Sequence, residues 1–372
     1  MRLRSLTAFA TAAFVLAACG TTREAGPPAP GAGPPGGIVA GYHAWWTGEA
    51  WQEYGYAPLD QLLFFSVDLA ADGTIRDRHG WPDAWFRMAE HARRQGVCVV
   101  PVVTLLEADT FVRLFEDEAH VRQLRETLLG LLRDSPAACG IQLDAEVFRA
   151  VPSPVRAAFT AFVVDLRGAM DALRPGLSLS LFLPAFDDAD VFDEAALARV
   201  ADYVVVQGYD LHARNDEQAG PVAALDGWGR RNWRVIVARY LGLGVPRTKL
   251  VMAVPYFGYE WPTETDAPGA RTRGPGQTIL SVPVDTTHLR VRRKVGAAMA
   301  ARHGLRRDPQ SGTPYYAFRD STGWHQGWFE DAESLRAKYA YVRQEGLAGV
   351  AVFTLGYGDP ALAAVLRAAF GE

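Results

Sequence analysis

The stretch CGIQLDAEVF, residues 139–148, has the length and apolar composition of a buried β-strand, yet it carries two carboxylates. Side chains alternate across a strand, so Gln142, Asp144 and Glu146 are expected on one face and only apolar side chains on the other. A buried strand with a polar face requires an interior that can accept polar groups. The architecture around this strand therefore decides what the two carboxylates do.

Seven further runs share the short, apolar and β-rich character of a strand: 37–46, 61–70, 97–105, 177–185, 203–212, 249–261 and 349–359. Between them lie amphipathic segments with helix-start and helix-stop residues, clearest at 82–96, 117–135, 153–176 and 331–346. Alternating strands and helices predict an α/β fold with parallel strands, and eight such units favour a closed (β/α)8 TIM barrel. An open doubly wound sheet is the alternative, but no glycine-rich phosphate loop follows the first strand.

One interval breaks the alternation. Residues from 262 to about 327, between the seventh and eighth strands, are rich in Gly, Pro and Arg and contain short strand-like pieces at 278–280 and 314–320. This interval predicts a small α+β insertion in place of a crossover helix.

In a barrel, the polar face of residues 139–148 would line the interior and rise toward the C-terminal mouth, where active sites of this fold lie. Asp144 and Glu146 would repel each other and be partly desolvated there, which raises at least one pKa and suits a general acid. The other interpretation is a structural pair whose carboxylates are satisfied by neighbouring Arg or Tyr groups. Spacing alone leaves both interpretations open.

Composition narrows the class of function. The 372 residues are 49% hydrophobic and 22% charged, with 38 basic and 42 acidic residues and a formal net charge of -4. No long basic block occurs, so nucleic acid is not an expected partner. Histidines and cysteines show no metal-ligand spacing, so neither a metal nor another cofactor is expected. Cys98 and Cys139 are predicted to be buried free thiols, although a bridge between consecutive strands is geometrically conceivable.

The N-terminus has the features of an export signal: a short basic start, an apolar core from Leu6 to Ala18 and a small-residue exit. The exit LAAC resembles the bacterial lipoprotein processing site, which would make Cys19 the lipidated first residue of the mature protein. Residues 1–18 would be the signal peptide and residues 19–37 a Pro/Gly-rich tether. The catalytic barrel would span residues 38–372, held at the cell envelope, as a periplasmic or outer-membrane lipoprotein, by its lipid alone.

Several motifs together resemble glycoside hydrolase family 18, the family of chitinases and related endo-N-acetylglucosaminidases. CGIQLDAE resembles the fourth-strand pattern D-x-x-D-x-D-x-E, with Cys139 and Gln142 replacing the first two aspartates. VVQGYD resembles M-x-Y-D on strand six, with Gln207 in the Met position. AVPYFGYEW resembles G-x-P-x-Y-G-R on strand seven, with Tyr259 for Arg. On the last strand, Phe353 stands where a tryptophan usually forms the floor of the sugar site.

The resemblance implies substrate-assisted, retaining hydrolysis of β-linked N-acetylglucosaminides. Glu146 would be the acid, and Asp144 and Tyr209 would hold the acetamido group that attacks the anomeric carbon. The resemblance also implies a sugar contact for Asp210. The motif positions and aromatic residues complete the expected substrate-binding set: Gln142, Gln207, Trp45, Tyr256 and Phe353.

Two functional classes stay open from the sequence. One is a monomeric hydrolase acting on a glycan that contains N-acetylglucosamine, such as a chitin-type oligosaccharide or peptidoglycan. The other is a carbohydrate-binding relative without catalysis. The retained Glu146, Asp144 and Tyr209 favour the hydrolase, whereas the replacements at positions 139 and 142 favour the binding protein. With Gln142 in place of aspartate, Asp144 is expected to ionise readily and to accept a hydrogen bond from the Gln142 amide.

Overall fold

The computed structural model describes residues 37–281 and 294–371. The predicted signal peptide, the lipidation residue Cys19 and all of the predicted tether except Gly37 lie outside these residues. Within the described ranges, no helix combines the length and the apolar composition needed to cross a bilayer.

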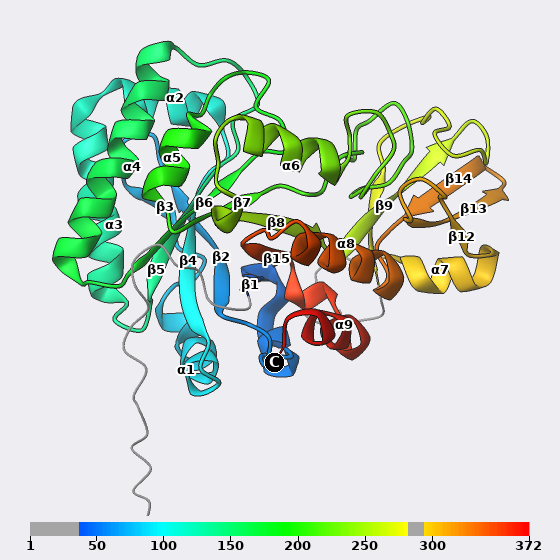
Figure 1. The fold of residues 1–372 in the computed structure, drawn as a ribbon, viewed down its shortest axis with the longest axis horizontal. Helices are drawn as coiled ribbons and strands as arrows, with labels where there is room; N and C mark the ends of the chain where they lie inside the picture. Colours follow the sequence, from blue (N-terminus) through cyan, green and yellow to red (C-terminus); the bar gives the residue numbers. More distant parts are fainter. Residues whose placement is uncertain (1–36, 282–293, 372) are drawn as a thin grey trace, which may run out of the picture. The chain divides into compact units, whose positions relative to one another are not determined.

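Eight parallel strands close into a barrel, which confirms the fold expected from the sequence (Figure 1). They are β1 (Ile38–Ala44), β2 (Gln61–Leu69), β4 (Cys98–Leu105), β5 (Gly140–Ala145), β6 (Ser178–Leu183), β7 (Tyr203–Val206), β8 (Leu250–Pro255) and β15 (Gly349–Phe353). Closure comes from β1, which pairs in parallel with both β2 and β15. A short strand β3 (Ile75–Asp77) pairs antiparallel with β2.

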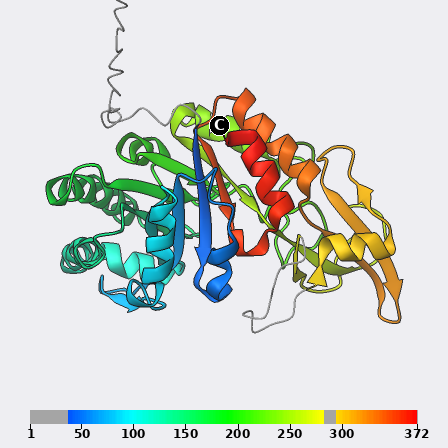
Figure 2. The same ribbon diagram turned by 90° about the horizontal axis from the view of Figure 1, so that it is seen from below.

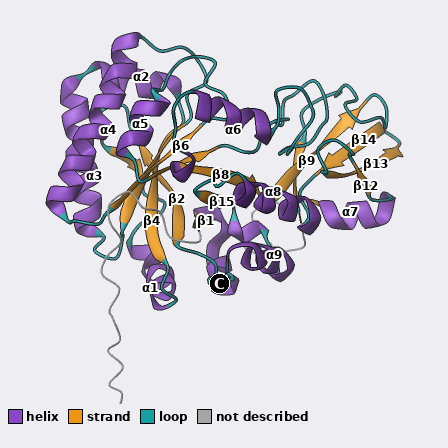
Figure 3. Cartoon of the chain, viewed as in Figure 1, coloured by secondary structure: helices purple, strands orange, loops and turns teal. Residues whose placement is uncertain are grey.

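Helices surround the strands (Figure 3), so both faces of the barrel wall are buried and its strands are nearly continuous apolar runs. The helices are α1 (Phe86–Arg94), α2 (Ala108–Glu116), α3 (Glu118–Asp134), α4 (Ser153–Leu173), α5 (Glu194–Val200), α6 (Trp233–Gly242), α8 (Ala332–Gln344) and α9 (Pro360–Phe370). Short 3-10 segments occur at η1 (Trp45–Glu53), η2 (Asp83–Trp85), η3 (Arg247–Lys249) and η4 (Leu355–Tyr357). The four helices expected most clearly from the sequence correspond to α1, α3, α4 and α8.

A second sheet is inserted between β8 and α8. Its strands are β9 (Phe257–Thr263), β10 (Gln277–Leu280), β11 (Lys294–Val295), β12 (Arg306–Arg307), β13 (Pro314–Asp320) and β14 (Gly323–Trp328), in the order β11-β10-β9-β14-β13-β12. Helix α7 (Gly296–His303) packs on β13 and β14 beside the barrel (Figure 2). The insertion was expected from residue 262, but the second sheet begins five residues earlier.

The second sheet begins early because the run 249–261, which was predicted to be one strand, forms two strands, β8 and β9. The barrel strand β8 ends at Pro255, and after Tyr256 the chain enters β9, which pairs antiparallel with β10 and β14. A continuous apolar run carries no signal for this change of sheet. Gly258 lies where β9 and β14 approach closely, and a Cβ there would collide with the carbonyl oxygen of Trp328.

Cys98 and Cys139 form a disulfide, so the prediction of two free thiols was wrong. The two residues stand at the starts of the neighbouring parallel strands β4 and β5, with Cα atoms 5.9 Å apart. A bridge between Val99 and Ala138 fixes the register at this point. Spacing in the sequence could not reveal this register, whereas strand pairing determines it.

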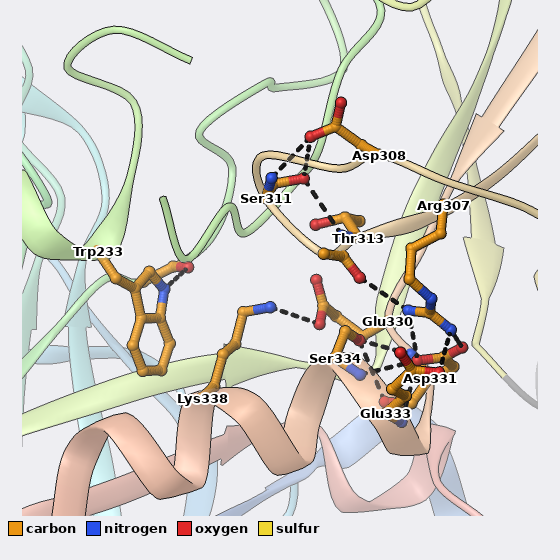
Figure 4. Close-up of polar contacts among 12 residues, drawn as sticks. Trp233, Arg307, Asp308, Ser311, Thr313, Glu330, Asp331, Glu333, Ser334 and Lys338 are labelled. Atoms are coloured by element: carbon orange, nitrogen blue, oxygen red, sulfur yellow. Dashed lines mark hydrogen bonds and ion pairs between the residues drawn. The ribbon is translucent and has the colours of Figure 1, made fainter. Parts of the chain in front are cut away.

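The chain returns from the inserted sheet to α8 through a group of polar contacts (Figure 4). Lys338 of α8 and Glu330 form an ion pair with Nζ and Oε2 2.7 Å apart, and both side chains are 0% exposed. Within the described residues, Oε1 of Glu330 has no hydrogen-bond partner. Arg307 of β12 pairs with Asp331, the N-cap residue of α8, at 2.7 Å. These contacts join the inserted sheet to the barrel helix that follows it.

We predict that Lys338→Met destabilises the protein by about 3–5 kcal/mol, because it leaves the Glu330 carboxylate buried without its cation. Lys338→Met combined with Glu330→Leu should recover most of that loss, since both charges are then replaced by apolar groups. Urea unfolding of the three proteins measures the difference. Equal destabilisation in the single and double variants would contradict a dominant role for the unpaired charge.

Candidate active site

A cavity of about 240 Å³ lies at the C-terminal ends of the barrel strands. It is lined by Tyr42, Phe65, Asp144, Glu146, Phe182, Gln207, Tyr209, Asp210, Phe257, Tyr259, Thr278, Phe353 and Tyr357. Two kinds of side chain therefore share the cavity: three carboxyl groups and a set of aromatic rings. The lining residues from β9 and β10 show that the inserted sheet forms part of its wall.

Strand β5 brings Asp144 and Glu146 into the cavity in the register expected from alternation. Asp144 is 3% exposed, and its Oδ1 has no hydrogen-bond partner among the described residues. Glu146 follows the last residue of the strand, where its backbone N–H donates to the carbonyl oxygen of Leu105 at 3.2 Å. The strand thus places two carboxyl groups at one point of the mouth, and the described residues that line the cavity include no lysine or arginine.

Burial raises the pKa of both groups. Burial raises the pKa of Asp144 well above its usual range, and the negative charge of Glu146 raises it further. For Glu146, burial and then the charge of Asp210 raise the pKa to about 7. A glutamic acid with this pKa is partly protonated at neutral pH, as a general acid requires.

Asp210 is the third carboxyl group, and it follows β7. Its backbone has φ +57°, in the left-handed region that an aspartate tolerates better than most residues. Its Oδ1 accepts a hydrogen bond from the Tyr259 hydroxyl at 2.9 Å. Burial raises the pKa of Asp210 to about 6, and the Tyr259 hydrogen bond opposes that rise.

Phe353 lies among the aromatic rings of the cavity, as its motif position predicts. Its ring centroid is 5.4 Å from those of Tyr42 and Phe65, and it stacks on Tyr209 at 5.8 Å. The peptide bond after Phe353 and the one after Phe65 are both cis. Apolar rings with a few polar groups between them match the chemistry of a sugar, whose C–H faces stack on aromatic side chains.

Of the nine predicted catalytic and substrate-binding residues, the cavity brings together Glu146, Asp144, Tyr209, Asp210, Gln207 and Phe353. Gln142, Trp45 and Tyr256 are not among its lining residues. Trp45 is 39% exposed and stacks on His79, with centroids 4.4 Å apart. Tyr256 is buried, with its hydroxyl 3.5 Å from that of Tyr339 on α8. It does not line this cavity, and its assignment to substrate binding stays a prediction.

Gln142 lies below the cavity, completely buried inside the barrel. Its Oε1 accepts from the Tyr42 hydroxyl at 2.7 Å, and its Nε2 donates to the Ser180 hydroxyl at 3.1 Å. The expected hydrogen bond from the Gln142 amide to Asp144 is wrong, because that amide is bonded to Tyr42 of β1 and Ser180 of β6 instead. The expected ready ionisation of Asp144 is also wrong, because burial favours its protonated form.

Sequence reasoning missed several lining residues, namely Tyr42, Phe65, Phe182, Phe257, Tyr259 and Thr278. Phe257 and Tyr259 fall inside the motif AVPYFGYEW, so the sequence could have indicated that both lie near the site. Phe65 and Phe182 are only two of many aromatic residues in apolar strands, so the sequence did not distinguish them. Across residues 37–281 and 294–371, no group of three or more His, Cys, Asp or Glu side chains is placed to hold a metal ion.

Comparison with known proteins gives a family match. The pattern described as "Glycosyl hydrolases family 18" matches residues 42–358. The "Cortical fragment-lytic enzyme" of Bacillus anthracis is 23% identical over 316 residues, covering 81% of this chain and 66% of that protein. The chain covers 47%, 66% and 63% of the length of three of its curated relatives.

Solved structures show the same fold. A family GH18 chitinase from Cycas revoluta, in complex with allosamidin, has a TM-score of 0.74 and 18% identity, covering 90% of this chain and 100% of that one. The chitinase-like agglutinin RobpsCRA from Robinia pseudoacacia has a TM-score of 0.74 and 18% identity, covering 89% and 99%. At this identity, the likeness concerns the fold alone.

The raised pKa of Glu146 predicts a pH-dependent effect on stability. Glu146→Gln removes a group whose pKa is about 4.5 in the unfolded chain and about 7 in the folded one. The wild-type protein should lose stability relative to this variant as the pH rises through that interval, by up to about 3 kcal/mol. Below about pH 4.5 the advantage of the variant should disappear.

Urea unfolding at pH 4.5 and at pH 8 measures this difference. Glu116→Gln, at an exposed position of α2, is the matched control for loss of a glutamate. A Glu146→Gln effect that is the same at both pH values would contradict the raised pKa.

Proposed function

The chain belongs to the glycosyl hydrolases of family 18, and from this premise we propose that it hydrolyses β-linked N-acetylglucosaminides by substrate-assisted, retaining catalysis. The substrate is a chitin-type oligosaccharide or the glycan of peptidoglycan. One observation carries the proposal: Glu146, with its raised pKa, lies in the aromatic cavity together with Asp144, which has a buried acceptor atom without a partner.

In the first step, Glu146 donates its proton to the glycosidic oxygen, and the bond from that oxygen to the anomeric carbon breaks. The carbonyl oxygen of the 2-acetamido group forms the new bond to the anomeric carbon, which gives an oxazolinium ion. In the second step, Glu146 accepts a proton from water as the water attacks the anomeric carbon from the side that the leaving group vacated. The bond from the acetamido oxygen to the anomeric carbon breaks, which restores the 2-acetamido group. The configuration at this carbon is retained.

Asp144 and the Tyr209 hydroxyl act on the acetamido group in this mechanism. The unpartnered Oδ1 of Asp144 is an acceptor for the acetamido N–H, so it can orient the acetamido group for attack on the anomeric carbon. Tyr209 is held against Phe353 by stacking, so its position is fixed before the substrate arrives. Asp210 and Gln207 contribute polar groups to the same cavity.

A second candidate is a glycan-binding protein that does not hydrolyse its ligand. The observation that favours it is the neutral network below Asp144, where Gln142 is tied to Tyr42 and Ser180 and cannot exchange a proton with Asp144. Product analysis of the purified full chain on chito-oligosaccharides and on peptidoglycan separates the possibilities. Shortened glycans from either substrate support the hydrolase, and bound but uncleaved glycan supports the binding protein.

We predict that Glu146→Gln lowers kcat by about 100-fold or more while glycan binding is retained. The amide keeps the shape of the side chain but has no acidic proton to donate. Turnover of one chito-oligosaccharide and calorimetric binding of the same ligand test both parts, with Glu116→Gln as the control. Full turnover by Glu146→Gln would exclude Glu146 as the acid.

We also propose that the protein is a lipid-anchored monomer of the cell envelope, with Cys19 as its acylated residue. The sequence of residues 1–37 supports this proposal, since an apolar core and a small-residue exit precede a tether with few apolar side chains. Cys19→Ser should move the protein from the membrane fraction to the soluble fraction of cells that express it. A variant that stays in the membrane fraction after salt and carbonate washing would contradict the anchor.

A further inference from the structure

Tyr259 reaches the cavity from the inserted sheet. It stands on β9, with its backbone paired to Thr278 of β10 on one side and to Trp328 of β14 on the other. Its ring packs edge-on against Phe257 and Trp261, with centroids 5.6 and 5.4 Å away. A side chain supported on both sides by strands has little freedom, so the position of its hydroxyl is set by the inserted sheet.

The hydroxyl of Tyr259 donates to Oδ1 of Asp210 at 2.9 Å, and both residues line the cavity. Asp210 follows β7, in a loop whose position is not fixed by strand pairing. Its backbone is in the left-handed region. The hydrogen bond from the inserted sheet therefore fixes a carboxylate that belongs to the barrel.

We propose that Tyr259 is a positioning residue which holds the Asp210 carboxylate toward Glu146, so that the inserted sheet sets the upper pH limit of the reaction. The proposal rests on the proposed function, in which Glu146 must carry a proton to act. It assigns a role in the chemistry to a sheet that lies outside the barrel.

The direction of the effect follows from the charges around the two carboxyl groups. Asp210 faces Glu146 and the Tyr259 hydroxyl, and Asp216, which is ion-paired with Arg231, adds negative charge nearby. The Tyr259 hydrogen bond favours the ionised form of Asp210 and lowers its pKa. After burial, ionised Asp210 is the largest influence that raises the pKa of Glu146.

Glu146 has other titratable neighbours. It acts electrostatically on Asp144 of β5, Tyr209 after β7 and Tyr42 of β1. Loss of the Tyr259 hydroxyl leaves these three groups in place. The change in Glu146 then comes from Asp210, which takes up a proton more readily and repels the Glu146 carboxylate less.

The test is the pH profile of kcat/KM for Tyr259→Phe on one chito-oligosaccharide. The basic limb should move down by about 0.5 to 1 in pH, which lowers kcat/KM about 3- to 10-fold above the limb. Asp210→Asn should shift the limb in the same direction, and the double variant should shift it no further than Asp210→Asn alone. Tyr315→Phe removes a hydroxyl from another tyrosine of the inserted sheet, one stacked on Trp328 at 4.3 Å, and should leave the limb unchanged.

A second readout does not depend on turnover. The Glu146 carboxyl carbon, labelled with 13C and assigned by its absence in Glu146→Gln, can be titrated by NMR in the full chain. Its midpoint should fall in Tyr259→Phe and stay in place in Tyr315→Phe. An unchanged midpoint, or additive shifts in the double variant, would overturn the role of Tyr259. If the chain binds glycan without hydrolysing it, the proposed function fails while the NMR result still decides the role of Tyr259.

Discussion

Three carboxyl groups, one buried and two half-buried, at one mouth of a barrel form the constraint on which the site depends. Asp144, Glu146 and Asp210 lie among aromatic rings, and the lining residues of this cavity include no lysine or arginine within the described chain. Like charges in a poorly solvated space cannot all ionise near neutral pH, so protons stay bound. The ability to donate a proton is therefore a consequence of packing.

The barrel can hold such a site because its interior is already polar at lower levels. Beneath the cavity, Gln142 joins Tyr42 to Ser180, and at the next level Gln61 joins Tyr203 to Ser178. Each of these amides spans strands that are distant in the sequence. The result is a pair of neutral, hydrogen-bonded layers that fill the barrel and leave the carboxyl groups above them without a proton-accepting partner from below.

The inserted sheet is part of the active site as well as an addition to the barrel. Through Phe257, Tyr259 and Thr278 it closes one side of the cavity. The segment after β14 and the edge strand β12 are joined to α8 by the buried pair of Lys338 and Glu330 and by the contact of Arg307 with Asp331 (Figure 4). The sheet is thus fastened to a barrel helix, which suits a wall that positions a hydroxyl.

The sequence by itself determined the order of strands and helices, the barrel, the inward register of β5 and the carboxyl groups at its end. These features are local, because periodicity and short motifs record them within about ten residues. Tertiary structure alone decided two other matters: the disulfide of Cys98 with Cys139 and the partners of Gln142. Each depends on which strands become neighbours and in what register, and a single sequence does not contain that register. The same holds for Phe65 and Phe182, whose rings differ from other buried aromatics only through the space that the closed barrel leaves beside them.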